Sequence, residues 1–162
     1  MHLVEYIWID GVGSLRSKTR VLSNLENIPF WTYDGSSTGQ AKSNNSEIIL
    51  KPCAVFKNTI HPDEITLVLC ETYENDGQPT QSNHRNNACK LFNENKESEP
   101  WFGLEQEYFL MDMNTNLPLG FTDATKQGQY YCSVGVDNAF GRELVEEHAK
   151  LCLEYGIKLS GV

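Results

Sequence analysis

The chain has 162 residues and a net charge of −9, with 40% hydrophobic and 22% charged residues. This length suffices for one large domain or two small ones, and the acidic balance argues against a nucleic-acid partner and a polybasic membrane patch. No apolar run approaches the roughly 20 residues that span a bilayer, and the N-terminus lacks a basic, cleavable leader. We therefore expect a cytoplasmic protein that does not bind a membrane.

The first predicted elements form a β-hairpin. Leu3–Ile9 is rich in β-forming residues, Asp10–Gly13 has the composition of a turn, and Leu15–Leu22 can return as the second strand. The Gly11-x-Gly13 pair is read as turn chemistry rather than a phosphate loop, because no helix signal follows it.

A polar loop with glycines and hydroxyl side chains covers Tyr33–Gly39. Asp34 is followed by a glycine and two serines, which is typical of an Asx turn or a serine turn. A turn alone explains this composition. A second acidic residue, Glu47, follows at the start of a predicted strand and favours a functional role for the loop.

Two further strands are predicted at Glu47–Phe56 and Ile65–Tyr73. The polar segment Glu74–Pro79 then predicts a boundary between domains 1–78 and 79–162. A helix is predicted over Asn83–Asn95, with three apolar residues on its inner face: Ala88, Leu91 and Phe92.

Glu105 and Glu107 stand two residues apart in Gly103–Met111, a stretch with apolar and aromatic flanks that predicts a buried strand. On a strand the two side chains would share one face, about 6 to 7 Å apart. Buried like charges need compensation, and two hard oxygen donors at this spacing suit a pair of Mg²⁺ or Mn²⁺ ions. The alternative is an edge strand with one solvated face.

The last third of the chain predicts a loop over Asn114–Gly128, a strand over Tyr130–Val136 and a helix that begins at Asp137 and ends before Gly156. The five cysteines are odd in number and form no C-x-x-C pair. We expect reduced core thiols rather than disulfides or a zinc site: Cys53, Cys70, Cys89, Cys132 and Cys152.

Several of these segments, in this order, resemble the eukaryotic-type glutamine synthetases. The resemblance covers essentially the whole chain and is most specific at Trp101–Tyr108, which is similar to the family's first metal-binding strand. The other matching segments are Tyr6–Gly11, Tyr33–Ser37 through Ser46-Glu47, Leu67–Glu71 and Gln129–Asp137.

This resemblance implies an α+β chain, with an N-terminal β-grasp domain followed by the start of the catalytic α/β domain. It also implies a glutamate–ammonia ligase that uses ATP and two or more Mg²⁺ or Mn²⁺ ions. Its substrates would be ATP, glutamate and ammonium, its intermediate γ-glutamyl phosphate, and its assembly a homo-oligomeric ring.

The resemblance also implies residue roles. Glu105 corresponds to a ligand of the metal on the ATP phosphates, and Glu107 to a ligand of the metal on the glutamate side. Asp34 corresponds to the carboxylate that binds ammonium for a neighbouring subunit and takes its proton. Four further residues fall near that ammonium pocket: Ser37, Glu47, Tyr130 and Tyr131.

The family's remaining metal ligands and its phosphate-binding arginines correspond to positions beyond Val162. We therefore expect that the 162 residues alone do not synthesise glutamine. Two other interpretations stay open: a short, non-catalytic paralogue that acts as a binding or assembly subunit, and an unrelated acidic metal-binding domain.

Overall fold

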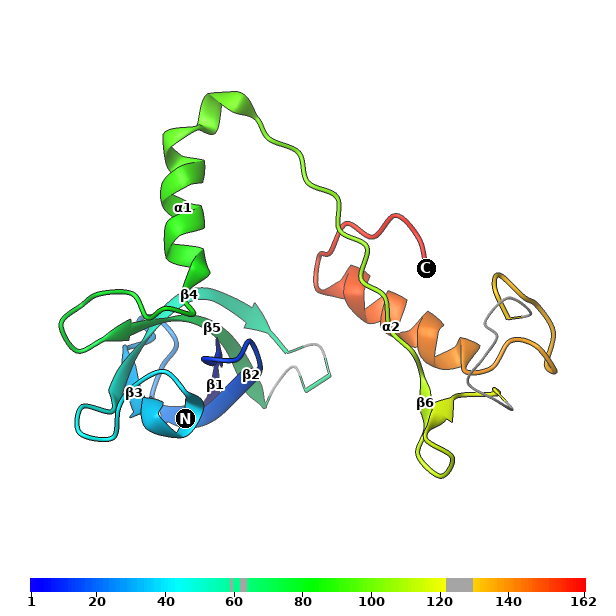
Figure 1. Ribbon diagram of the computed structural model, residues 1–162, viewed down its shortest axis with the longest axis horizontal. Coiled ribbons are helices and arrows are strands. Elements are labelled where there is room, and N and C mark those ends of the chain that lie inside the picture. Colours follow the sequence, from blue (N-terminus) through cyan, green and yellow to red (C-terminus); the bar gives the residue numbers. More distant parts are fainter. Residues whose placement is uncertain (59, 62–63, 122–129) are drawn as a thin grey trace. The chain divides into compact units, whose positions relative to one another are not determined.

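The computed structural model describes residues 1–58, 60–61, 64–121 and 130–162 (Figure 1). They fall into two units, residues 1–100 and residues 101–162. The predicted division after residue 78 stays a prediction. Among the described residues, no helix combines the length and the apolarity that crossing a membrane requires.

The first unit is built on a five-stranded mixed sheet with the order β2-β1-β5-β4-β3. The interior strands β1 and β5 pair in parallel, and every other pairing is antiparallel. The hairpin and the two later strands are confirmed. The strands are β1 (His2–Ile9), β2 (Leu15–Leu22), β3 (Trp31–Asp34), β4 (Glu47–Lys57) and β5 (Ile65–Glu74).

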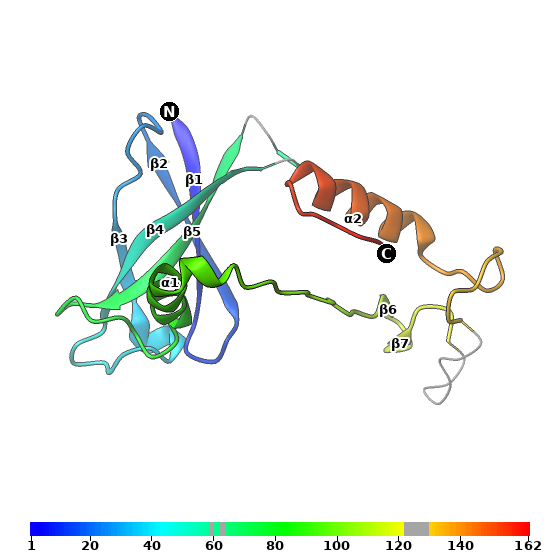
Figure 2. The same ribbon diagram turned by 90° about the horizontal axis from the view of Figure 1, so that it is seen from above.

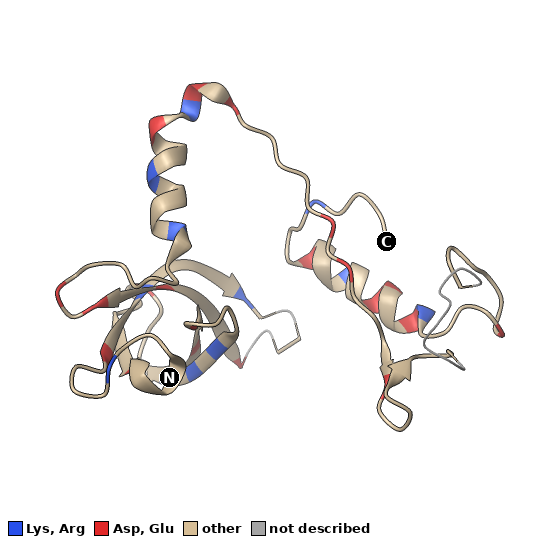
Figure 3. Cartoon of the chain, in the orientation of Figure 1, with Lys and Arg blue, Asp and Glu red and all other residues tan. Residues whose placement is uncertain are grey.

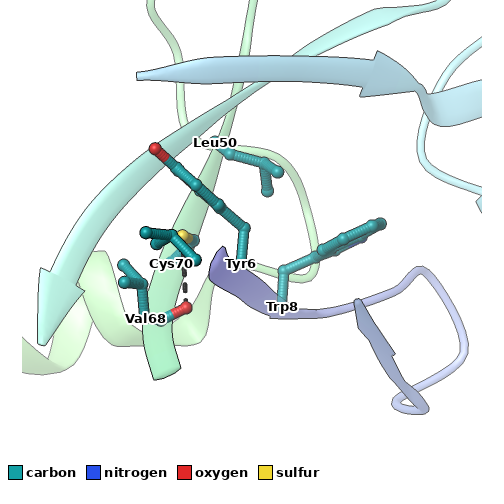
Figure 4. Close-up of a cluster of buried hydrophobic side chains, with 6 residues drawn as sticks. Tyr6, Trp8, Leu50, Val68 and Cys70 are labelled. Atoms are coloured by element: carbon teal, nitrogen blue, oxygen red, sulfur yellow. Dashed lines mark hydrogen bonds between the residues drawn. The ribbon is translucent and has the colours of Figure 1, made fainter. Parts of the chain in front are cut away.

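The strands bury one face of the sheet because alternate residues along them are apolar. Val4, Tyr6 and Trp8 of β1 point into a core that Leu50 of β4 and Val68 of β5 complete (Figure 4).

All five cysteines are free thiols, but only Cys70 is buried and Cys132 is exposed. The expectation of core thiols is therefore wrong for Cys132.

Curling of the sheet brings its edge strands together around this core (Figure 2). The Tyr6 ring packs edge-on against Trp31 with ring centroids 5.3 Å apart, although β1 and β3 are not neighbours in the sheet. The Lys18 ammonium of β2 donates to the Thr32 carbonyl of β3 at 2.7 Å and lies 3.5 Å from the Trp31 ring centroid. Side chains thus connect the two sheet edges.

Helix α1 (His84–Glu94) follows the sheet, with Asn83 as its N-cap and Asn95 as its C-cap, and η2 (Lys96–Ser98) comes next. The helix is confirmed, but its predicted apolar inner face is wrong, because Leu91 and Phe92 are 59% and 51% exposed. The start of the helix contacts the sheet through polar groups instead. The Asn86 amide, for example, donates to the Tyr73 hydroxyl at 2.9 Å.

The second unit contains the short hairpin of β6 (Met111–Asp112) and β7 (Leu117–Pro118), followed by helix α2 (Arg142–Glu154). Acidic residues outnumber basic ones along α2 (Figure 3). The helix starts later than predicted: Gly141, at φ +73°, is its N-cap. Asp137 lies in the turns before it. The predicted end is confirmed, since Gly156 adopts φ +77° and closes the last turn.

Two other predictions for this unit have different outcomes. The strand expected at Tyr130–Val136 is wrong, because these residues form turns, with the Ser133 N–H donating to the Tyr130 carbonyl at 3.3 Å. The loop expected at Asn114–Gly128 lies partly outside the described residues. The chain is an α+β protein as predicted, and the β-grasp assignment stays a prediction.

The core packing yields a test of stability. Replacing Leu50, which is fully buried, with Ala should lower the free energy of unfolding by about 2–5 kcal/mol through lost burial and the cavity left behind. The matched control is Leu15→Ala at a 70% exposed position, where a change within about 0.5 kcal/mol is expected. Urea unfolding followed by tryptophan fluorescence measures both. Equal effects of the two substitutions would contradict the observed core.

Candidate functional site

Asp34 ends β3 and caps the short 3₁₀ helix η1 (Gly35–Thr38) with its side chain. Its Oδ1 accepts the Ser36 backbone N–H at 3.0 Å and the Ser36 hydroxyl at 2.6 Å. The Ser37 hydroxyl donates to Oδ2 at 2.9 Å. The predicted Asx turn is confirmed, and the two serines fix the orientation of the carboxylate.

These donors stabilise the charged form of Asp34. The hydrogen bond from the Ser36 hydroxyl is the largest cause, followed by that from Ser37, and together the donors lower the pKa of Asp34 from 3.8 to about 2. The residue is exposed, so a small cation can approach the carboxylate from solvent. At neutral pH this loop presents a fixed negative charge.

Glu47 lies directly opposite Asp34, because the two residues are register partners in the antiparallel β3–β4 pair. The Gly35 N–H, which donates to the Ser46 carbonyl at 2.6 Å, continues this pairing into η1. Opposite residues in an antiparallel pair project from the same face, with Cβ atoms about 4.5–5.5 Å apart. The structure thus brings together two of the predicted site residues, and their like charges favour a cation between them.

A pocket of about 440 Å³ adjoins this sheet edge. Glu47 and Glu74 contribute carboxylates to its lining, and Asp34 is not among the lining residues. The other polar side chains of the lining come from Gln40, Lys42, Asn44, Asn45 and Asn75. Because Lys42 offsets part of the charge of the two acids, the lining suits a polar ligand better than an apolar one.

Gln40 holds the loop against the sheet through both ends of its amide. Its Oε1 accepts the Tyr33 hydroxyl at 2.5 Å and the Thr38 hydroxyl at 2.8 Å. Its Nε2 donates to the Ser82 hydroxyl at 2.9 Å and to the Ile9 carbonyl at 3.2 Å. One amide therefore ties the loop both to the end of β1 and to the segment before α1.

The hairpin turn after β1 supports the same loop from its other side. The Gly11 N–H donates to the Thr38 carbonyl at 2.9 Å, and a Cβ at Gly11 would lie only 2.3 Å from the Gly39 carbonyl oxygen. The predicted turn is confirmed, and its first glycine is needed for a close approach of two backbones.

Glu105 and Glu107 differ from the prediction in their local structure. Residues 101–110 form no strand, and both carboxylates are exposed. A strand requires a hydrogen-bonded neighbour, and no described segment pairs with these residues. Within the described ranges, no three acidic, cysteine or histidine side chains gather into a group that could hold a metal. The residues present therefore do not form a metal site by themselves.

Tyr130 and Tyr131 belong to the second unit and have different surroundings. The Tyr130 ring stacks on Phe121, with centroids 4.5 Å apart, and its hydroxyl donates to the Gly120 carbonyl at 3.1 Å. Tyr131 is 76% exposed. Tyr130 thus contributes to local packing, and the assignment of either tyrosine to an ammonium pocket stays a prediction.

Sequence reasoning placed Ser36 in the predicted turn at Asp34 but missed Gln40 as a part of this site. Ser36 had a readable signal, because a serine two residues after an aspartate is the donor position of an Asx turn. Gln40 had none, since its partners at Ile9, Thr72 and Ser82 are distant in sequence.

Comparison with known proteins identifies relatives of the whole chain. No protein-family model matches it. A glutamine synthetase of Agaricus bisporus is 46% identical over 98% of this chain and 46% of its own length. A glutamine synthetase of Tuber borchii is 46% identical over 99% of this chain and 46% of its own length. A cytosolic isozyme of glutamine synthetase from Daucus carota is 45% identical over 99% of this chain and 48% of its own length.

The chain is homologous to the glutamine synthetases. The predicted resemblance to the N-terminal portion of this family is confirmed, and the chain spans about half the length of the relatives that it matches. The relatives' names do not assign roles to individual residues, so the roles of Asp34, Ser37, Glu47, Glu105 and Glu107 in glutamine synthesis stay predictions.

The hydrogen bonds to Asp34 predict its titration. Following the Asp34 carboxyl by NMR should give a midpoint near pH 2, and the double substitution Ser36→Ala with Ser37→Ala should raise it toward 3.8. Ser43→Ala, in the exposed part of the following loop, is the control and should leave the midpoint unchanged. The stabilisation linked to this lowered pKa is fully present above pH 3.8 and is lost as the pH falls through about 2.

The close backbone approach at Gly11 yields a second prediction. Gly11→Ala should displace the Asp34 loop, because the new Cβ meets a backbone oxygen that cannot rotate away. We expect amide chemical shifts of residues 34–40 to change and the free energy of unfolding to fall by about 1–3 kcal/mol. Gly103→Ala, at a glycine with open space around it and no positive φ, controls for the general cost of replacing glycine. Unchanged amide shifts at 34–40 would disprove the supporting role of Gly11.

Proposed function

We propose that this chain forms part of a glutamate–ammonia ligase, in which the Asp34 loop binds the ammonium ion. The observation that carries the proposal is the register pairing of two acidic residues, Asp34 and Glu47, at the edge of the sheet. Similarity to glutamine synthetases over at least 98% of the chain supports it. By analogy with the carrot relative, named a cytosolic isozyme, the proposed location is the cytoplasm.

The chemistry of ammonium fits this loop. Ammonium carries four N–H donors and one positive charge, so it needs oxygen acceptors and a negative environment. The Asp34 carboxylate supplies both, and its low pKa keeps it charged throughout the physiological range. Glu47 adds a second negative charge on the same face of the sheet.

The same low pKa separates two roles that the family resemblance assigns to Asp34. A carboxylate with a pKa of about 2 attracts cations well but accepts protons weakly. The geometry in this chain therefore supports ammonium binding more directly than proton removal. For Asp34 to accept the proton, its pKa must rise in the assembled site, for example through exclusion of water.

The proposal includes assembly. In the first unit the loop is exposed, and the resemblance implies that Asp34 serves the reaction centre of a neighbouring subunit. We propose a homo-oligomeric ring in which Ser37 orients Asp34 from within the loop. Tyr130 or Tyr131 would complete the ammonium pocket.

ATP and divalent metals enter the proposal through the family alone. Glu105 and Glu107 offer two hard oxygen donors, which suit Mg²⁺ or Mn²⁺ in kind but are too few for two ions. Among the described residues, no group of acidic, cysteine or histidine side chains could hold a metal without further ligands. Formation of γ-glutamyl phosphate from ATP and glutamate likewise stays a proposal.

The 162-residue chain should form no glutamine from ATP, glutamate and ammonium at any Mg²⁺ or Mn²⁺ concentration, because two carboxylates cannot complete the metal sites. A coupled assay of glutamine formation checks this. The positive control is the full-length Agaricus bisporus relative under identical conditions. Turnover by the purified chain would disprove the need for further ligands.

A chimaera tests the role of Asp34. It joins this chain to the unmatched remainder of the Agaricus bisporus relative, which supplies the rest of the family's sequence. We expect Asp34→Asn to raise the KM for ammonium by about tenfold or more and to leave the KM for ATP nearly unchanged, because the lost charge faces the nucleophile. Asp76→Asn, an exposed aspartate whose side chain likewise caps a turn, is the matched control.

Mixed assemblies then test whether Asp34 acts across subunits. When Asp34→Asn subunits co-assemble with Glu107→Gln subunits, some interfaces join an intact Asp34 loop to a subunit with an intact Glu107. Part of the activity that each single variant loses should therefore return. If Asp34→Asn does not change the KM for ammonium and mixed assemblies recover no activity, a binding or assembly role for the chain is favoured.

A further inference from the structure

A histidine and a cysteine form a contact on helix α2 that the proposed ligase function does not use. His148 and Cys152 are four residues apart, so they lie on the same face of the helix. The Cys152 Sγ and the His148 Nε2 are 3.5 Å apart. A thiol beside an imidazole can transfer its proton to the ring and become the more nucleophilic thiolate.

A third side chain orients the imidazole from its other edge. The Tyr108 hydroxyl lies 3.3 Å from the His148 Nδ1, and the two rings pack edge to face with centroids 5.6 Å apart. When Nδ1 carries the ring hydrogen and donates it to the Tyr108 oxygen, Nε2 has a free lone pair that faces the thiol. The arrangement thus matches a nucleophile, a base and an orienting group.

We propose that Cys152 is a modification site of this chain, at which hydroperoxides oxidise the thiol and His148 serves as the base. The proposal does not depend on the ligase function. None of its three residues, Tyr108, His148 and Cys152, has a role in the proposed ligase site.

The proposed reaction balances with hydrogen peroxide as the oxidant. The Cys152 proton moves to the His148 Nε2, and the thiolate attacks one peroxide oxygen. An S–O bond forms as the O–O bond breaks, and the leaving hydroxide takes the proton from the imidazolium. The products are a sulfenic acid on Cys152 and water, with sulfur oxidised and peroxide reduced by two electrons.

The other thiols give contrasting environments. Burial raises the pKa of Cys70 to about 12 and also raises that of Cys53, so both should react slowly. Cys132 is exposed, whereas Cys152 is only half-buried. If exposure alone decided reactivity, Cys132 would be modified first. The contact with His148 predicts Cys152 instead.

Cys152 lies in the last turn of α2. The carbonyl end of a helix disfavours a negative charge there. Because the helix end opposes the thiolate, the proposed reactivity of Cys152 requires the imidazole of His148.

The test is site-resolved oxidation of the 162-residue chain. The protein is treated with limiting hydrogen peroxide, sulfenic acids are trapped with dimedone, and each cysteine peptide is quantified by mass spectrometry. We expect Cys152 to be labelled first. His148→Gln should slow labelling at Cys152 by about tenfold and leave Cys132 unchanged. Helix content measured by circular dichroism confirms that the variant is folded.

A second pair of variants tests the orienting role of Tyr108. Tyr108→Phe removes the hydroxyl that holds the ring hydrogen on Nδ1 and should slow labelling at Cys152 selectively, and Tyr108→Ala, which also removes the ring packing, should slow it further. Two results would overturn the proposal: faster labelling of Cys132 than of Cys152, or a rate at Cys152 that does not change in His148→Gln. A gain of labelling at the buried Cys70 would show a change of fold and would also count against a local role of His148.

Discussion

Packing of aromatic rings across the curled sheet is the constraint on which the first unit depends. Two rings of the interior strand β1 pack on two rings of the edge strand β3. The ring centroids are 5.3 Å apart for Tyr6 and Trp31 and 4.4 Å apart for Trp8 and Tyr33. Because β3 ends at Asp34, this packing also positions the backbone from which the Asp34 carboxylate projects. Gln40 and Gly11 then position the rest of the loop against the same strand. Core and site therefore share one set of contacts.

Local signals were sufficient for much of the first unit. Alternating apolar residues and turn composition predicted β1, β2, β4 and β5, and Asn83 marked the start of α1. The edge strand β3 was missed, although Trp31, Thr32 and Tyr33 are all strong β-formers. The sequence prediction placed the end of this strand, Tyr33 and Asp34, in a polar loop, and the pairing of β3 with β4 is set by contacts that no short window contains.

Sequence reasoning was weaker in the second unit for a physical reason. Apolar and aromatic flanks at Glu105 and Glu107 are compatible with a buried strand, but a strand also needs a hydrogen-bonding partner. The described residues provide none, and the flanking Trp101 and Leu104 are 95% and 96% exposed. Helix α2 illustrates the complementary case. Its end was predictable from Gly156, whereas its start was not, because Gly141 rather than a polar cap precedes it.

The pairing of Asp34 with Glu47 couples ligand occupancy to the stability of the sheet edge. Two carboxylates opposite each other on β3 and β4 repel, and β3 has only one neighbouring strand to hold it. A cation that binds between them removes this repulsion, so its binding free energy adds to the stability of the β3–β4 pairing. If ammonium binds as proposed, it would also act as a structural ion, and the ordering of the sheet edge would follow its concentration.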